Sequence, residues 1–236
     1  ASSEPKGPAM LLVVGLSGID AREAEAIASS GVDAGLILNQ SSDAKIVRQM
    51  VEAARDIPLG VFVKDIGEEG VNELADSGCD FLVFDIKSSA LVMHKKGIGK
   101  FLVVEASLGE GSMRAISALD VDGVFIKGGE EAFVTVEHLL VYRRLNDLVD
   151  KPVMAILPSL VTNIELEDLQ QTGIAGVVTP AVAQPTEILA ELRKRIDDLP
   201  RVAKRRRDKV GVILPHYGGS GDVGEEEEEE EEEEDI

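Results

Sequence analysis

The chain has 236 residues, of which 44% are hydrophobic, and a formal net charge of −20 at pH 7. This apolar content suffices for a sizeable core and excludes a wholly disordered chain. A single Cys excludes a disulfide framework and any Cys-based zinc site. The negative charge argues against nucleic acid as a partner, because phosphate binding needs a basic surface. With 3% aromatic residues and no Trp, the core is expected to be aliphatic.

The two ends of the chain differ in composition from the rest. Residues 1–9 are polar and are expected to form an N-terminal extension. Residues 201–236 start with a basic stretch and include ten consecutive glutamates at 225–234. Because such a run repels itself and buries nothing, residues 201–236 are expected to be mostly disordered. The poly-Glu run is either a solvated tail or an arm that binds a basic protein partner.

The sequence offers no signal for a membrane. No stretch reaches the roughly 18 apolar residues that a bilayer-spanning helix requires. The apolar run at residues 10–16 is too short for a secretory signal and has the pattern of a strand. We therefore expect no membrane association and a soluble, cytoplasmic protein in a reducing setting.

Eight short, continuous apolar runs recur between residues 10 and 200. Such runs are typical of buried parallel strands, because both faces of each strand are covered. The runs occupy residues 11–14, 35–38, 59–63, 81–84, 101–104, 123–126, 153–157 and 176–178.

Segments with helical spacing of apolar residues separate these runs. They occupy residues 21–30, 43–56, 69–77, 88–95, 112–119, 133–150, 163–172 and 185–199, with 88–95 the weakest. The longest, 133–150, carries more apolar residues than one face needs to cover a sheet. A surplus of this kind indicates a subunit contact, so we expect a homodimer.

A weak internal repeat recurs before every second strand. Gly31-Val32-Asp33 and Gly78-Cys79-Asp80 precede the second and fourth strands, and Asp122-Gly123 and Gly173-Ile174-Ala175 precede the sixth and eighth. A two-strand quarter repeated four times predicts a (β/α)8 TIM barrel of eight parallel strands with outer helices, over residues 10–200. An open, doubly wound sheet is the alternative, but eight evenly spaced strands favour closure.

Three short segments of the chain resemble the ribulose-phosphate-binding type of TIM barrel. They are Gly31-Val32-Asp33-Ala34, Lys151-Pro152-Val153 and residues 173–178. That type includes thiamine phosphate synthase, indole glycerol phosphate synthase and the phosphosugar aldolases, and the resemblance points to no single family. It implies a phosphate site after the seventh and eighth strands, usually built from glycines. The corresponding loops here, residues 157–160 and 179–182, lack those glycines.

The active site of such a barrel lies at the carboxyl ends of the strands. The candidate residues at these positions are Ser17, Asn39, Lys64, Asp65, Asp85, Lys87, Glu105, Lys127, Ser159 and Thr179. Three lysines and three carboxylates around one opening suit acid–base and imine chemistry. The phosphosugar aldolases carry an imine-forming Lys on the sixth strand, so the resemblance implies Lys127 as the nucleophile.

The other roles follow from charge. Glu105 or Asp85 is expected to act as the base and Lys64 or Lys87 as an anion clamp; the further substrate-binding candidates are Asn39, Ser17, Ser159 and Thr179. This favours a lyase or aldolase acting on a small anionic carbonyl or phosphosugar-like substrate. A non-catalytic scaffold that binds partners through its acidic tail is the alternative. An enzyme with flavin or another phosphate-bearing cofactor is a third interpretation. The sequence specifies no cofactor and, with three widely spaced histidines, no metal.

Overall fold

The computed structural model describes residues 8–38, 43–128, 131, 133–157, 161–181 and 186–200. The chain divides into a unit of residues 1–202, which contains all of these, and a unit of residues 203–236, which contains none. Most of the predicted extension at residues 1–9 and the whole of the predicted disordered tail at 201–236 therefore lie outside the described residues.

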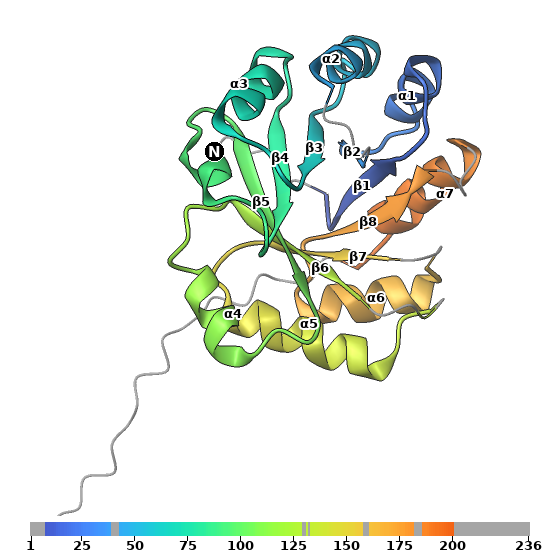
Figure 1. The fold of residues 1–236 in the computed structure, drawn as a ribbon. Helices are drawn as coiled ribbons and strands as arrows, with labels where there is room; N and C mark the ends of the chain where they lie inside the picture. Colours follow the sequence, from blue (N-terminus) through green and yellow to red (C-terminus); the bar gives the residue numbers. More distant parts are fainter. Residues whose placement is uncertain are drawn as a thin grey trace, which may run out of the picture. The chain divides into compact units, whose positions relative to one another are not determined.

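Eight parallel strands pair in chain order and close into one barrel, because β1 pairs with both β2 and β8. Figure 1 shows the strands at the centre of this unit, with helices outside them. The strands are β1 (Leu11–Leu16), β2 (Ala34–Ile37), β3 (Leu59–Val63), β4 (Phe81–Asp85), β5 (Gly99–Glu105), β6 (Gly123–Lys127), β7 (Val153–Ile156) and β8 (Gly176–Pro180). The predicted (β/α)8 barrel is confirmed, and the open sheet is excluded.

Within the described residues, six α-helices and one short 3₁₀ helix connect the strands, and a seventh α-helix, α7, follows β8. The helices are α1 (Ala21–Ala28), α2 (Ala44–Ala53), α3 (Glu68–Asp76), η1 (Ala90–His94), α4 (Glu110–Ile116), α5 (Val136–Leu148), α6 (Asn163–Thr172) and α7 (Thr186–Asp197). The segment predicted as a weak helix at 88–95 forms the 3₁₀ helix η1. Only residues 86–98 separate β4 from β5, the shortest strand-to-strand connection in the barrel, so a full helix does not fit there.

The longest helix, α5, divides its apolar residues between core and surface. Leu139 and Val141 pack against the core, whereas Val136 and Leu140 are 74% and 67% exposed. The predicted homodimer through this helix stays a prediction.

Strand residues alternate between two apolar clusters. One cluster contains only strand residues and takes them from all eight strands, so it fills the barrel interior. Its members are Val13, Ala34, Leu36, Phe62, Phe81, Val83, Phe101, Val103, Phe125, Met154, Ile156 and Val178. The other cluster joins the opposite strand faces to the buried sides of the helices.

The barrel interior is more aromatic than the composition predicts. Four of the six phenylalanines lie in it, namely Phe62, Phe81, Phe101 and Phe125. The Phe81 and Phe101 rings meet edge to face with centroids 5.3 Å apart, and Phe101 lies 5.3 Å from Phe125. Eight of the twelve interior residues are non-aromatic, in line with the prediction, but the few aromatic residues of the chain are concentrated there.

Glycines on neighbouring strands make room for these rings. Phe81 is in register with Gly60 on β3 and with Gly99 on β5. A Cβ atom at Gly60 would lie 2.1 Å from the Phe81 ring, and one at Gly123 would lie 2.8 Å from the Phe101 ring. Large residues thus face glycines across the strands, which fills the interior without overlap.

The repeated aspartates fasten the amino ends of the strands. Each accepts a hydrogen bond on Oδ2 from a backbone N–H of the preceding strand: Asp33 from Leu12 at 2.7 Å, Asp80 from Leu59 at 2.8 Å and Asp122 from Lys100 at 2.8 Å. Each aspartate N–H also donates to the carbonyl of that same residue. In the fourth quarter Ala175 keeps only the main-chain bond, to the Val153 carbonyl. The repeat is therefore a structural device of the amino end.

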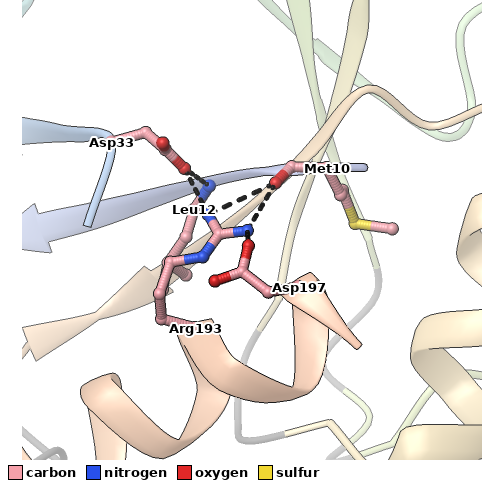
Figure 2. A network of polar contacts seen from close by, with 5 residues as sticks. All are labelled: Met10, Leu12, Asp33, Arg193 and Asp197. Carbon is pink, nitrogen blue, oxygen red and sulfur yellow. Dashed lines mark hydrogen bonds and ion pairs between the residues drawn. The ribbon is translucent and has the colours of Figure 1, made fainter. Parts of the chain in front are cut away.

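Arg193 of α7 joins the first of these aspartates to the start of β1 (Figure 2). Its guanidinium donates to Asp33 Oδ2 and to Asp197 Oδ1, each at 2.6 Å, and to the Met10 carbonyl at 3.4 Å. The Arg193 side chain is 11% exposed, so solvent screens these contacts weakly. The last helix is thereby tied to the first strand, where the barrel closes.

Candidate functional site

Strand alternation brings four charged side chains to the interior side of the barrel rim. Asp85, Glu105 and Lys127 are the last residues of β4, β5 and β6, and Lys64 directly follows β3. Each lies two residues beyond an interior residue: Phe62, Val83, Val103 or Phe125. Because side chains repeat their direction every second residue, all four follow the interior face. They belong to four consecutive strands, and we call them the charged half of the rim.

Of these four residues, Glu105 and Lys127 are direct neighbours in the sheet. They are register partners on neighbouring strands, which lie about 4.8 Å apart in a sheet. Both are exposed. Within the described residues, neither their side chains nor that of Lys64 make a hydrogen bond or an ion pair. An amine and a carboxylate are therefore carried by neighbouring strand ends, and both residues are exposed.

Asp85 is half-buried and is oriented by the turn after β4. Its Oδ1 accepts from the Lys87 backbone N–H at 2.8 Å and from the Ser88 hydroxyl at 3.2 Å. The Ser88 hydroxyl oxygen in turn accepts from the Asp85 backbone N–H at 3.2 Å. The structure therefore fixes the direction of this carboxylate, while the Lys87 side chain is exposed.

The remaining candidates are placed differently. Ser17 is exposed in the turn after β1. Thr179 lies next to the interior residue Val178 and so takes the opposite, helix-facing side of β8, where it is 1% exposed. Its hydroxyl has no hydrogen-bond partner in the described part of the chain. Asn39 and Ser159 lie outside the described residues. Thr179 is thus not brought together with the charged half.

The opposite half of the rim is apolar at the level of the strands. Ile156, half-buried, is in register with Lys127, and Pro180 is in register with Gly15. Leu38 is 37% exposed and covers Gly15, where an added Cβ would lie 2.8 Å from Leu38 Cδ1. We call Ile156, Pro180 and Leu38 the apolar half; it comprises β7, β8 and β2, and the exposed Ser17 lies two residues after Gly15 on the same face of β1.

Gly128, which follows Lys127, lies next to two buried residues of α5, His138 and Tyr142. The sequence did not point to these two residues as part of the site. A Cβ at Gly128 would lie 2.9 Å from the Tyr142 hydroxyl and 3.6 Å from His138 Nε2. The two rings stack with centroids 5.8 Å apart. Burial, assisted by the charge of Glu131, raises the pKa of Tyr142 to about 12, so this phenol stays protonated at neutral pH.

His138 is held by its own helix start. Its Nδ1 accepts from the Thr135 N–H at 3.2 Å, and its Nε2 lies 3.4 Å from Glu131 Oε2. Since Nδ1 is an acceptor, Nε2 carries the proton of the neutral ring. The local signal was present in the sequence, because Thr135 and His138 have the spacing of a capping box.

Two properties of the described residues bear on metal binding and on membrane insertion. No group of three or more His, Cys, Asp or Glu among them could hold a metal ion. Among the helices that they form, none has the length and apolar character needed to span a bilayer.

The comparisons with known proteins bear on the fold. No protein-family model matches the chain, and no curated protein matches its sequence. Thiamine phosphate pyrophosphorylase from Pyrococcus furiosus superposes with a TM-score of 0.61 at 14% identity, over 80% of this chain and 96% of that one. The chain is a TIM barrel.

Tryptophan synthase gives similar matches. The enzyme from M. tuberculosis in its open form has a TM-score of 0.61 at 13% identity, over 81% of this chain and 94% of that one. A variant of the alpha-subunit from Pyrococcus furiosus has a TM-score of 0.60 at 13% identity, over 81% and 98%. The predicted resemblance to thiamine phosphate synthase-like barrels is confirmed for the fold, with no single family assigned.

Proposed function

We propose that the protein is a lyase- or aldolase-type enzyme that acts on a small anionic carbonyl compound at the carboxyl end of the barrel. The register pair of Glu105 and Lys127 supports this proposal more than any other observation. An amine that attacks a carbonyl needs a neighbouring group to carry its protons. Both side chains follow the interior face of the rim, and within the described residues neither is engaged elsewhere.

The first step is imine formation. The unprotonated Nζ of Lys127 attacks the carbonyl carbon, and a C–N bond forms as the C=O π pair moves to oxygen. Glu105 transfers one proton from the nitrogen to that oxygen, and a second proton taken up from solvent through Glu105 lets the oxygen leave as water, so that an iminium that keeps one N–H remains. In this step Glu105 acts first as a base and then as an acid.

The second step breaks a carbon–carbon bond. Asp85 or Glu105 accepts the proton of the substrate's β-hydroxyl, and the electrons of the Cα–Cβ bond form an enamine C=C bond. The iminium π pair returns to nitrogen, and an aldehyde leaves. Protonation of the enamine and addition of water to the resulting iminium release the second product and regenerate Lys127.

Two cations are available for the anionic group of the substrate. Lys64 lies in the charged half, and Lys87, two residues after Asp85, is exposed. One of the similar barrels is named for a phosphate compound, which agrees with an anionic substrate. Active sites of TIM barrels lie at this end of the strands.

Reductive trapping tests the proposal. The protein is incubated with pyruvate, 2-oxobutanoate or dihydroxyacetone phosphate, reduced with borohydride, and analysed by intact-mass and peptide-mapping spectrometry. We expect a carbonyl adduct on Lys127 that is absent in Lys127→Ala and retained in Lys45→Ala, a matched loss of an exposed lysine on α2. Glu105→Gln should slow trapping by about 10² to 10⁴-fold, as loss of a general acid–base does. Unchanged labelling of Lys127→Ala would refute the assignment.

The alternative, a non-catalytic barrel that binds a basic protein through residues 201–236, makes the opposite prediction. No carbonyl compound would then label the protein above the level of Lys127→Ala. A chain ending at residue 200 would lose affinity for a basic partner, whereas the proposed enzyme would keep its trapping activity after this truncation.

A further inference from the structure

The most exposed large apolar side chains of the described residues lie on the outer side of α5 and at the start of α6. Val136 and Leu140 of α5 are 74% and 67% exposed, Ile164 of α6 is 73% exposed, and Phe133, just before α5, is 64% exposed. Every other large apolar side chain that the structure describes is less exposed than these four. We call them the α5 patch, and we infer that two copies of this chain associate through it as a symmetric dimer.

Two helices that pack against each other carry the α5 patch. α5 and α6 lie side by side outside the barrel (Figure 1). Their starts are joined by a hydrogen bond of 2.8 Å from the Val134 N–H to Glu165 Oε1. Phe133 and Ile164 each directly precede one partner of this bond, and the two α5 members of the patch lie one turn apart. Exposed apolar surface of this kind is typical of a protein–protein contact.

Leu140 lies at the middle of the exposed side of α5, and the buried residues of this helix take the opposite side. At 3.6 residues per turn, Glu137 and Arg144 lie on one flank of Leu140, about two turns apart. Val136 and Arg143 have the same spacing on the other flank. Leu140 is close to the midpoint of both pairs. A two-fold axis beside Leu140 therefore brings each member of a pair level with the other member on the second copy.

The resulting contact is self-complementary. When two copies of α5 lie antiparallel about this axis, Glu137 of each copy meets Arg144 of the other, so the same ion pair forms twice. The aliphatic part of Arg143 covers Val136 of the second copy in the same way. The two Leu140 side chains meet at the axis. Apolar residues thus form the centre of the contact, and charged groups form its edge, as in other protein interfaces.

The charges of α5 favour a second copy over a partner of one predominant sign. Its four charged side chains are all exposed, and they are Glu137, Arg143, Arg144 and Asp147. A strongly basic partner would bring cations to the two arginines, and a strongly acidic one would bring carboxylates to the two acids. An antiparallel second copy avoids both by setting Glu137 against Arg144. The overall charge of −20 on each copy opposes association, but physiological salt screens it beyond about 8 Å.

Sedimentation velocity of the full chain tests the inference. At an ionic strength of about 0.15 M, the mass is expected to rise from that of one chain to that of two between about 1 and 200 µM protein. Leu140→Glu places two acids together at the axis and should raise the Kd of the dimer by about 30-fold or more. Leu91→Glu, the same change at a 46% exposed leucine of η1, should leave the Kd unchanged.

A charge reversal tests the antiparallel orientation. Glu137→Arg sets an arginine against Arg144 of the second copy, twice in each dimer, and should raise the Kd by about 2- to 30-fold. Adding Arg144→Glu to the same chain re-forms the pair with the signs exchanged and should lower the Kd again. A double variant that associates no better than Glu137→Arg alone would overturn the inference.

The other outcomes are equally distinct. A single chain at every concentration would overturn the inference, and the α5 patch would then be left to a segment of residues 201–236 or to another protein. A dimer that Leu140→Glu does not weaken would overturn it as well. Should Leu140→Glu fail to fold, as judged by circular dichroism, Val136→Glu at the most exposed position of the patch takes its place with the same expectation. None of these measurements involves trapping on Lys127, so their failure leaves the proposed function untouched.

Discussion

Replacing Asp33 with Asn tests how the barrel is closed at its amino end. Asp33 Oδ2 accepts from the Leu12 N–H at 2.7 Å and from Arg193 at 2.6 Å. The amide oxygen of Asn keeps an acceptor for Leu12, but the charge that pairs with Arg193 is lost. Asp80→Asn is the matched control, because Asp80 makes the same bond to a strand N–H and, among the described residues, no ion pair with an arginine.

The expected difference follows from the burial of the ion pair. Hydrogen bonds to charged groups contribute about 1.5–3 kcal/mol, and exposed ion pairs about 0.2–1 kcal/mol. The side chains of Arg193 and Asp33 are 11% and 28% exposed. Because the pair is partly buried, we expect its contribution to stability to lie between these two energy ranges. Asp197, at 2.6 Å, still pairs with Arg193 in the variant and offsets part of the loss. We therefore expect Asp33→Asn to cost about 1–2 kcal/mol more than Asp80→Asn.

Thermal and urea unfolding followed by circular dichroism measure this difference. For a barrel of this size, about 1 kcal/mol lowers Tm by about 2–4 °C, so Asp33→Asn should melt about 2–8 °C below Asp80→Asn. The gap should narrow when Arg193→Gln is the background, because the partner is then absent. Equal free energies of unfolding for the two variants, within about 0.5 kcal/mol, would refute the role assigned to the ion pair.

Three further predictions concern stability and reactivity. Gly60→Ala should cost about 1–3 kcal/mol in urea unfolding, because its Cβ would lie 2.1 Å from the Phe81 ring, and Phe81→Leu in the same chain should recover part of this loss. Burial raises the pKa of Glu165, but bonds from two backbone N–H groups and the Thr162 hydroxyl outweigh it and lower the pKa below the ordinary 4.5. The stability contributed by Glu165 is therefore present above pH 4.5 and lost as the pH falls through the lowered value, so the free-energy difference from Glu165→Gln should shrink in acid. Burial raises the pKa of Cys79 to about 11, so a thiol reagent at pH 8 should react far more slowly with the native protein than with the unfolded chain, and equal rates would contradict this.

Much of the fold could be predicted because its signals are local. The strand at 59–63 and the helix at 163–172 were predicted with their observed bounds. That helix starts at the capping box of Thr162 and Glu165 and ends at Gly173, which has a φ of 91°. Such caps are set by neighbouring residues alone, so the sequence states them directly.

The content of the barrel interior could not be predicted in the same way. A continuous apolar run gives no indication of which residues face inward, because both faces of the strand are buried. Phe81, Phe101 and Phe125 share the interior only because their strands pair in the register that the closed barrel imposes. That register is a property of the whole sheet.

The same limit applies to the candidate site. The ends of the strands were predicted well enough to name Lys64, Asp85, Glu105 and Lys127, but a shift of one residue along a strand reverses the direction of the side chain. Thr179 was predicted beside them and lies on the helix-facing side of β8. The division of the rim into a charged half and an apolar half also depends on strand order around the ring, which only closure defines.

The two ends of the barrel use acidic residues differently. At the amino ends, Asp33, Asp80 and Asp122 are each bonded to the backbone of a neighbouring strand, and these bonds hold the repeat together. At the carboxyl ends, Asp85 is held only by its own turn, and Glu105 has no partner among the described residues. An acid that no structural bond uses contributes little to stability. Among the described residues Glu105 therefore contributes little to folding, so Glu105→Gln should leave the free energy of unfolding nearly unchanged while it slows the proposed trapping on Lys127.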